Sequence, residues 1–267
     1  MGTDGSTITL AGGLKLSVVA RGLPTPLALV LLPGPIDSWV SYSPVLDNLP
    51  TSLAALAVSQ RGHGDSDKPE TGYGVGDFAA DVVALLDAAG IERAVLVGHS
   101  ASCLVARRVA IDHPDRVAGL VLEASPSTLE GHAGFVEFLD SVVAKVVDPV
   151  DPELARSLLT DTSTAAVPAA FLDQLVAEAA KTPARVWRDT FTSLLRYDDR
   201  GELAGATTPA LLVWGDADPI VDVAMQNELV RLLPRASLLT YVGCGHTPRW
   251  EQPDRFAADI AAFAAGL

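Results

Sequence analysis

Short apolar runs alternate with helical repeats along most of the chain. Residues 27–32 and 53–59 are continuous apolar runs, a pattern typical of strands that are buried on both faces. Between residues 75 and 89 apolar side chains recur at helical spacing, and Gly90 follows as an expected C-cap. Strands that alternate with helices in this way predict an α/β fold with a parallel sheet and right-handed crossovers.

The same pattern extends to both ends of the chain. Two short β-prone runs separated by Ala11-Gly12-Gly13 predict an antiparallel hairpin at the start. Strands are expected at residues 7–10, 14–20, 27–32, 53–59, 94–97, 117–122, 210–214 and 237–242. Further helices are expected at about residues 101–111, 223–233 and 253–265.

Strand signals disappear between residues 125 and 206. Apolar side chains there share helical faces, namely Phe135, Phe138, Leu139, Val142, Val143 and Val146, then Leu172, Leu175, Val176 and Ala179, and then Trp187, Phe191, Leu194 and Leu195. These faces exceed what short helices can bury against one another. We therefore expect a helical lid at residues 125–206, inserted into one core domain of residues 1–124 and 207–267. The alternative is that these helices pack elsewhere as ordinary core.

A candidate nucleophile lies where one buried strand turns into a helix. The stretch Gly98-His99-Ser100-Ala101-Ser102 follows four apolar residues and precedes a helix-compatible run. Such a tight turn needs small residues on both sides of Ser100, and it places the Ser100 hydroxyl above the edge of the sheet. Ser102 departs from the common G-x-S-x-G pattern and is tolerated because it is also small.

Two later segments hold the partners that a serine nucleophile needs. Asp216 and Asp218 follow the strand at 210–214, and His246 comes after the last strand in the small-residue loop Gly243-Cys244-Gly245. The order Ser, Asp, His along the chain is the one expected of a catalytic triad on this architecture. A hydroxyl is inert at its own pKa, so Ser100 needs His246 as a base.

Taken together, these motifs resemble the α/β-hydrolase superfamily, over essentially the whole chain. The resemblance is to small lid-bearing esterases, perhydrolases and lactonase-like members, and it includes Arg61-Gly62-His63-Gly64-Asp65-Ser66, Trp214-Gly215-Asp216-Ala217-Asp218-Pro219, and Glu251 and Pro253 downstream of Gly245-His246. It implies a mostly parallel eight-stranded sheet with helices on both faces. It also implies Asp218 as the triad acid, with Glu123 as the alternative acid.

The resemblance is weakest at the oxyanion hole. One donor would be the N–H of Ala101, and relatives take the second from the position of Pro35, which has no N–H. Three alternatives are open: Ile36 N–H donates through a shifted turn, a side chain or water replaces the donor, or the hole keeps a single donor and works slowly.

The resemblance implies a serine hydrolase that cleaves a carboxylic ester or lactone through an acyl-enzyme, with no cofactor and no metal. Ser100 argues against dehalogenases and epoxide hydrolases, which have an aspartate at this position. Perhydrolase, C–C hydrolase or lyase chemistry and a slow-turnover binding protein remain as alternatives. The expected substrate is small to medium and largely apolar, and its candidate contacts are Trp39, Leu104, Phe135, Phe138, Trp187 and Phe191.

Composition limits the partners and the compartment. The 19 basic and 33 acidic residues give a net charge of −14, which repels nucleic acid and anionic membranes. Cys103 and Cys244 form no metal or disulfide pattern, and no apolar run approaches the length of a membrane span. We expect a soluble cytoplasmic protein whose partner is its small-molecule substrate, with a homodimer left open.

Overall fold

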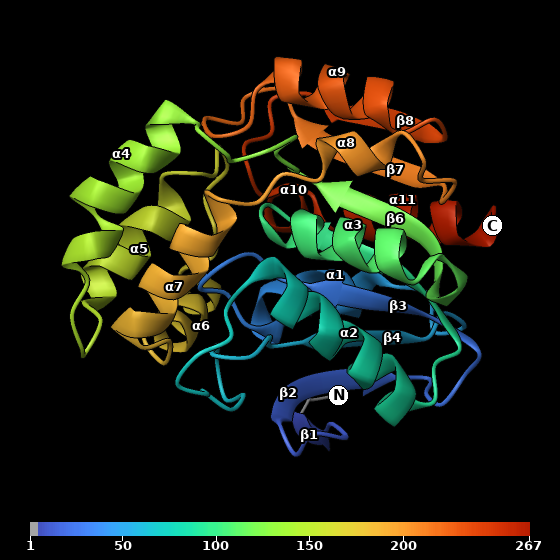
Figure 1. Cartoon of the computed structure of the whole chain (residues 1–267), viewed down its shortest axis with the longest axis horizontal. Helices are drawn as coiled ribbons and strands as arrows, with labels where there is room; N and C mark the ends of the chain where they lie inside the picture. The colour runs from blue at the N-terminus through green and yellow to red at the C-terminus, as the bar shows by residue number, and fades with distance from the viewer. Residues whose placement is uncertain (1–4) are drawn as a thin grey trace.

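The computed structural model describes residues 5–267 and contains one eight-stranded sheet (Figure 1). The strands are β1 (Ser6–Thr9), β2 (Lys15–Arg21), β3 (Leu27–Leu32), β4 (Ala55–Val58), β5 (Arg93–His99), β6 (Val117–Glu123), β7 (Ala210–Gly215) and β8 (Ala236–Tyr241). They lie in the order β1-β2-β4-β3-β5-β6-β7-β8. Strand β2 is antiparallel to both β1 and β4, and all other neighbours are parallel. The predicted mostly parallel sheet and its opening hairpin are confirmed.

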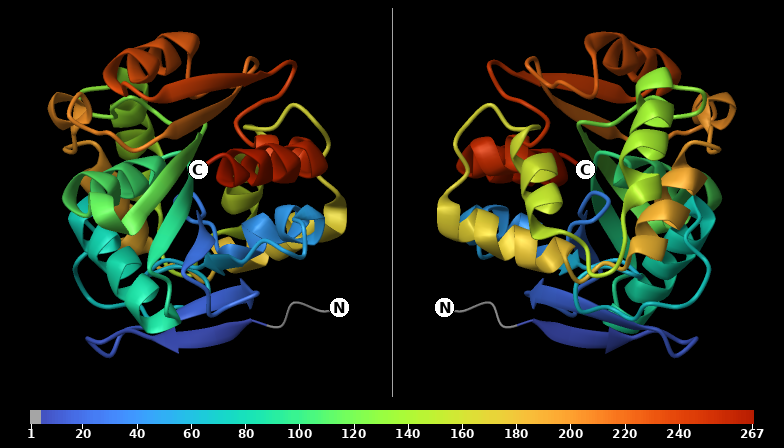
Figure 2. Two further views of the ribbon diagram at one scale, coloured as in Figure 1. Left: turned by 90° about the vertical axis from the view of Figure 1, so that its right-hand side faces the viewer. Right: turned by 90° about the vertical axis from the view of Figure 1, so that its left-hand side faces the viewer.

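Helices cover both faces of this sheet (Figure 2). One face carries α2 (Val75–Ala89), α3 (Ser102–Asp112) and α9 (Val223–Leu232), and the other carries α1 (Ser43–Asn48) and α11 (Pro253–Ala265). Successive residues of a strand point to opposite faces, so Val30 packs with the first group and Leu31 with the second. Every central strand is therefore buried on both sides, as its continuous apolar sequence predicts.

Several short helices were not predicted from the sequence pattern. Helix α1 has six residues and α10 (Pro248–Glu251) has four, and the 3₁₀ turns Trp39–Tyr42, Pro114–Arg116 and Val143–Lys145 are comparably short. Such segments are too short to repeat an apolar position at helical spacing. The helices α2, α3, α9 and α11 lie within one residue of their expected bounds, and Gly90 ends α2 at φ 66°.

Only helices and loops lie between β6 and β7. They are α4 (Ala133–Ser141), α5 (Pro152–Thr160), α6 (Ala169–Ala179), α7 (Ala184–Leu194) and α8 (Arg200–Leu203). Helices α4 to α7, called the cap helices below, lie beside the carboxyl ends of the parallel strands (Figure 1). Their apolar faces pack partly on one another and partly on Ile36, Val40 and Trp250. The domain bounds and the role of this segment as a lid stay predictions.

A buried ion pair ties the end of this helical segment to α3. Arg107 Nε lies 3.0 Å from Asp199 Oδ2, and both side chains are fully buried. The same guanidinium donates to the carbonyl oxygens of Pro126 and Ser127, at 2.9 and 3.0 Å. The chain is therefore held to α3 both where it leaves β6 and where it returns towards β7.

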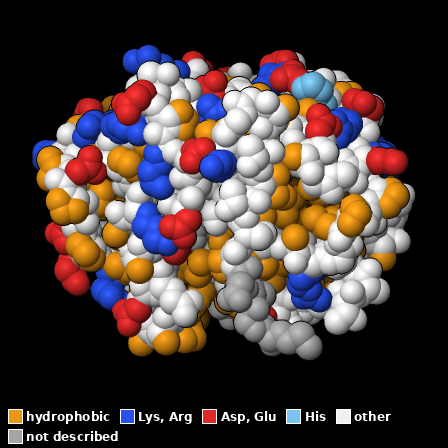
Figure 3. Space-filling model, turned by 90° about the horizontal axis from the view of Figure 1, so that it is seen from below, with side chains coloured by type: hydrophobic (Ala, Val, Ile, Leu, Met, Phe, Trp, Pro, Cys, Tyr) orange, Lys and Arg blue, Asp and Glu red, His pale blue; other side chains and the backbone are white. Residues whose placement is uncertain are grey.

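The surface beside the β1–β2 hairpin mixes charges of both signs. Figure 3 shows this face, with Lys and Arg side chains next to Asp and Glu side chains and apolar side chains between them. Among residues 5–267 no helix is long and apolar enough to cross a membrane. The cytoplasmic location and the oligomeric state stay predictions.

The loop Arg61–Ser66 buries a histidine that should make stability depend on pH. His63 is 3% exposed and its Nδ1 lies 2.8 Å from the carbonyl oxygen of Arg61. Burial lowers the pKa of His63 to about 4 from its usual 6.5. As the pH falls below 6.5, His63 is therefore protonated in the unfolded chain while it stays neutral in the folded protein. We expect this difference to lower the free energy of unfolding by up to about 3 kcal/mol between pH 6.5 and pH 4.

The His63→Asn variant tests this expectation, because asparagine keeps a donor for the Arg61 carbonyl and does not titrate. Urea unfolding at half-unit pH steps should give a shallower acid slope for His63→Asn than for the wild type. Parallel slopes would show that His63 is not responsible.

Candidate active site

The candidate nucleophile lies on a strained turn between β5 and α3. Ser100 has φ 53°, a left-handed conformation that is uncommon for residues other than glycine. A Cβ at Gly98 would lie 2.9 Å from Cys103 Cα, so only glycine lets the strand approach the helix this closely. The geometry places Ser100 in the wall of a cavity at the carboxyl edge of the sheet.

A histidine and an aspartate meet beside this serine. His246 Nδ1 lies 2.8 Å from Asp218 Oδ2, and the Asp218 side chain is fully buried. A carboxylate can only accept, so Nδ1 carries the proton in the neutral His246 ring, and Nε2 then has the lone pair. The other carboxylate oxygen of Asp218 accepts the N–H groups of Ile220 and Val221, at 2.8 and 3.0 Å. His246 and Ser100 line the same cavity.

The two competing acids are bound elsewhere. Glu123, at the end of β6, accepts the backbone N–H of Arg249 at 2.9 Å, and its Oε1 lies 3.5 Å from Arg249 Nη1. Asp216 is exposed and accepts the N–H of Gly243 at 2.6 Å, which holds the turn before His246. The carboxylate that contacts His246 is therefore Asp218, whereas Glu123 is bound to Arg249, and the catalytic role of either acid stays a prediction.

Arg249 is the centre of a buried charged cluster that sequence reasoning missed. Its side chain is fully buried and donates to Ser41 Oγ from Nε at 3.0 Å and to Asp37 Oδ2 from Nη2 at 2.9 Å. The guanidinium also lies 4.4 Å from the ring centre of Trp250. Burial raises the pKa of Glu123 and of Asp37, and the Arg249 charge opposes both shifts. Three distant segments supply this cluster, so no local motif reveals it.

His99, next to the nucleophile, supports the backbone of His246. Its Nε2 lies 3.0 Å from the His246 carbonyl oxygen, and the two rings are 4.9 Å apart in an edge-to-face arrangement. Burial holds the pKa of His99 well below its usual value. The neutral ring therefore donates from Nε2 and fixes the peptide that follows the candidate base.

A loop of the cap segment is tied directly to the histidine loop. The N–H of His246 donates to the carbonyl oxygen of Thr162 at 2.8 Å. Glu251 bridges the two loops, because Oε1 accepts the N–H of Gly245 at 2.9 Å and Oε2 accepts those of Thr164 and Ala165 at 3.2 Å. The position of His246 thus depends on the loop at residues 162–165.

The cavity has a volume of about 360 Å³ and is mostly apolar. Three of the expected contacts line it, namely Phe135, Phe138 and Phe191. The other three lie elsewhere. Leu104 is buried between α3 and the sheet, and Trp187 is buried among the cap helices. Trp39 packs against two clusters, one between the sheet and helices α1 and α11, and one that contains Val40. Their aromatic or apolar character gave no means to tell the core from the cavity wall.

Several lining residues were not expected. They include Leu129, Leu158, Leu159, Thr162, Ile220, Thr247 and Trp250, whereas Ile36, which also lines the cavity, was expected as an oxyanion donor. Of the residues 5–267, no lysine or arginine lines this cavity, and the one carboxylate that lines it, that of Asp37, is paired with Arg249. The cavity therefore suits a neutral molecule.

The turn before the 3₁₀ segment forms part of the same cavity wall. Asp37 N–H donates to the Gly34 carbonyl oxygen at 3.2 Å, Pro35 is the second residue of the turn, and Ile36 has φ 67°. A proline followed by a positive φ defines a type II turn, in which glycine is the usual third residue. Gly34, Pro35, Ile36 and Ala101 all line the cavity.

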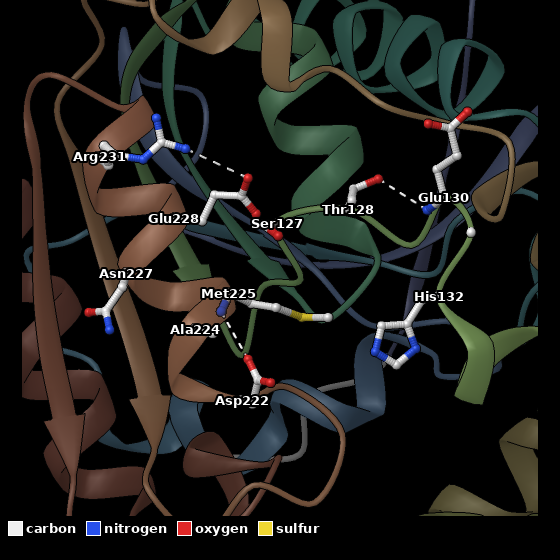
Figure 4. A pocket seen from close by; sticks show the side chains of 11 residues that line it. Ser127, Thr128, Glu130, His132, Asp222, Ala224, Met225, Asn227, Glu228 and Arg231 are labelled. Atoms are coloured by element: carbon white, nitrogen blue, oxygen red, sulfur yellow. Dashed lines mark hydrogen bonds and ion pairs between the residues drawn. The ribbon is translucent and has the colours of Figure 1, made fainter.

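A second, more open cavity of about 640 Å³ lies nearby, between residues 127–132 and α9 (Figure 4). Some of its polar groups bind one another or the backbone. Arg231 Nη2 lies 3.8 Å from Glu228 Oε1, Thr128 Oγ1 accepts the N–H of Glu130 at 3.0 Å, and Asp222 Oδ1 caps α9 through Met225 N–H at 2.9 Å. Among the described residues, His132 alone lines both cavities. Within residues 5–267 no cluster of three or more His, Cys, Asp or Glu side chains is arranged to hold a metal ion.

This fold and this site define a class of hydrolytic enzymes, and comparison with known proteins agrees. Residues 28–253 match the alpha/beta hydrolase fold family, and the chain belongs to that family. It is 27% identical to 2-hydroxymuconate semialdehyde hydrolase of Pseudomonas sp. (strain CF600), over 96% of this chain and 92% of that protein. It is also 27% identical to epoxide hydrolase A of Mycobacterium tuberculosis, over 100% and 99% of the two chains.

A solved structure extends the likeness. An esterase from Rhodococcus sp. ECU1013 superposes with a TM-score of 0.84 at 26% identity, over 98% of this chain and 99% of the esterase. The relatives catalyse different reactions, but they share the hydrolase class. The protein is accordingly an enzyme, a hydrolase of the α/β-hydrolase type.

Proposed function

We propose that the protein is a serine hydrolase that cleaves a neutral carboxylic ester or lactone. The observation that carries this proposal is the pairing of His246 with Asp218 in the cavity wall that also holds Ser100. Ser100 Oγ attacks the carbonyl carbon and gives its proton to His246 Nε2, which passes it to the leaving alcohol. Water, deprotonated by the same nitrogen, then cleaves the acyl-enzyme.

The oxyanion would be held by the N–H groups of Ala101 and Ile36. Ala101 stands at the N-terminus of α3, where an N–H has no partner inside the helix. A Pro-Ile pair forms a type I turn without strain, whereas the observed positive φ of Ile36 costs about 1–3 kcal/mol. The two turn types differ by a flip of the peptide between Pro35 and Ile36. The strained turn is therefore evidence that function requires the Ile36 N–H in the orientation that this turn gives it.

The cavity lining favours an apolar, uncharged acyl group. Phe135, Phe138 and Phe191 supply much of the apolar surface, and an anionic group would be buried there without a counter-ion. Epoxide opening is a poor fit to a serine, because its attack on an epoxide carbon forms an ether that water does not readily cleave. Ester or lactone cleavage instead passes through an acyl-enzyme that water can cleave. The cap helices would act as the lid over this cavity.

A fluorophosphonate probe and a substrate panel test the proposal. We expect the wild type to be labelled and Ser100→Ala not to be labelled. Among p-nitrophenyl esters of increasing chain length and several lactones, neutral substrates should be turned over with larger kcat/KM than carboxylate-bearing analogues of the same size. A folded wild type that is neither labelled nor active on the panel would favour a binding protein instead.

A further inference from the structure

Ser102 makes hydrogen bonds that a merely small residue would not make. Its Oγ donates to the Pro33 carbonyl oxygen at 2.6 Å. Gln60 Nε2 donates to Ser102 Oγ at 2.8 Å and to the same Pro33 carbonyl at 3.1 Å. Ser102 is 3% exposed and Gln60 is 8% exposed. The Pro33 carbonyl can only accept, so the amide nitrogen of Gln60 must face it.

These bonds hold the residue that leads into the Gly34–Asp37 turn. Pro33 and Pro35 have no N–H, and the N–H of Asp37 is used within the turn. The segment therefore has few donors with which to anchor itself, and the Pro33 carbonyl supplies the anchor instead. On the other side of the turn, a Cβ at Gly34 would lie 2.7 Å from His99 Nδ1. The turn is thus confined between His99 and the pair Ser102–Gln60.

We propose that Ser102 and Gln60 form a clamp that positions the Gly34–Asp37 turn, so that Ile36 N–H serves as the second oxyanion donor in place of the N–H that Pro35 lacks. Ser102 is then a positioning residue, which acts through Pro33 and does not touch the substrate. This proposal rests on the serine hydrolase function proposed above. It accounts for a hydroxyl at a position where G-x-S-x-G sequences have no side chain.

The Ser102→Ala variant tests the clamp. Complete loss of one oxyanion donor lowers the rate by about 10² to 10³, and a displaced donor should cost less. We expect kcat on the best ester of the panel to fall about 10- to 100-fold, with KM within about threefold of the wild type. Gln60→Met, which keeps the Ser102–Pro33 bond, should show a smaller loss in the same direction.

A transition-state analogue separates positioning from general damage. A trifluoromethyl ketone with the same acyl chain accepts Ser100 Oγ at its carbonyl carbon, the serine proton passes to His246, and the product is a hemiketal whose oxygen occupies the oxyanion site. Its affinity should fall in Ser102→Ala by the same factor as kcat/KM. The matched control is Ser66→Ala, because Ser66 is 2% exposed, its Oγ donates to the Ser59 carbonyl at 2.6 Å and accepts the N–H of Ser17, and it makes no hydrogen bond to Pro33 or to the Gly34–Asp37 turn. Ser66→Ala should keep both values within about threefold of the wild type.

Each outcome decides the matter. A Ser102→Ala enzyme with unchanged kcat, with only KM altered, or with lower kcat but unchanged ketone affinity would overturn the clamp and leave the hydrolase function standing. Equal losses in Ser102→Ala and Ser66→Ala would assign the effect to folding and overturn the clamp as well. A wild type that fluorophosphonate does not label would overturn the hydrolase function and the clamp with it.

Discussion

Replacing Asp218 by asparagine lowers kcat by about 10⁴, with little change in KM. The amide that this substitution introduces can present its N–H₂ to His246, which then accepts at Nδ1 and carries its proton on Nε2. In that tautomer the ring has no lone pair for the Ser100 proton. The acceptor for the N–H groups of Ile220 and Val221 is kept if the amide oxygen takes the place of Oδ1.

The matched comparison is Glu123→Gln, which makes the same acid-to-amide change at the other candidate acid. Glu123 contacts Arg249 and not the His246 ring, so we expect kcat within a few fold of the wild type. Steady-state kinetics on one p-nitrophenyl ester measure both variants. An Asp218→Asn enzyme within a few fold of the wild type, or a collapse of activity in Glu123→Gln, contradicts the assignment.

Replacing Arg249 by methionine lowers the free energy of unfolding by about 3–5 kcal/mol at neutral pH. The substitution leaves the carboxyl groups of Glu123 and Asp37 buried without their counter-ion. Burial already raises both pKa values, and the loss of Arg249 raises them further. A group whose folded pKa exceeds its unfolded pKa loses stability as the pH rises, so the deficit should be larger at pH 8 than at pH 5.

Urea unfolding of three variants checks this prediction. Arg108→Met is the control, because Arg108 pairs with Asp112 and Glu202, whose side chains are about half exposed, and such surface pairs contribute about 0–1 kcal/mol. Adding Glu123→Gln to Arg249→Met should recover part of the loss, since it removes one of the stranded charges. If Arg249→Met is no less stable than Arg108→Met, the cluster does not have the role assigned to it.

Local sequence patterns were sufficient to predict a structure wherever neighbouring residues alone determine it. The apolar run at residues 27–32 became a buried strand, and the helix at residues 75–89 ended at Gly90, because burial and turn geometry are encoded in neighbouring residues. The small residues around Ser100 likewise predicted its sharp turn, and φ 53° agrees. The missing N–H of Pro35 could also be read directly from the sequence.

Long-range packing decided the points that were wrong or left open. Asp218 and Glu123 both follow strands whose carboxyl ends meet at one edge, and only the buried Arg249 shows which carboxylate is occupied elsewhere. Leu104 and Phe135 are equally apolar, yet one faces the sheet and the other the cavity. Nothing near Ser102 in sequence predicts a bond to Pro33, 69 residues away.

The sequence by itself determined the α/β fold, the order of its strands and helices along the chain, and the sharp turn that carries Ser100, because apolar periodicity and turn residues act over a few positions. Only the tertiary structure decided which acid pairs with His246, which side chains line the cavity, and what holds the Gly34–Asp37 turn. Those outcomes depend on contacts between segments that are far apart in the chain. Hydrogen bonds between such segments produce no periodic pattern in the neighbouring sequence, so the sequence pattern does not predict them.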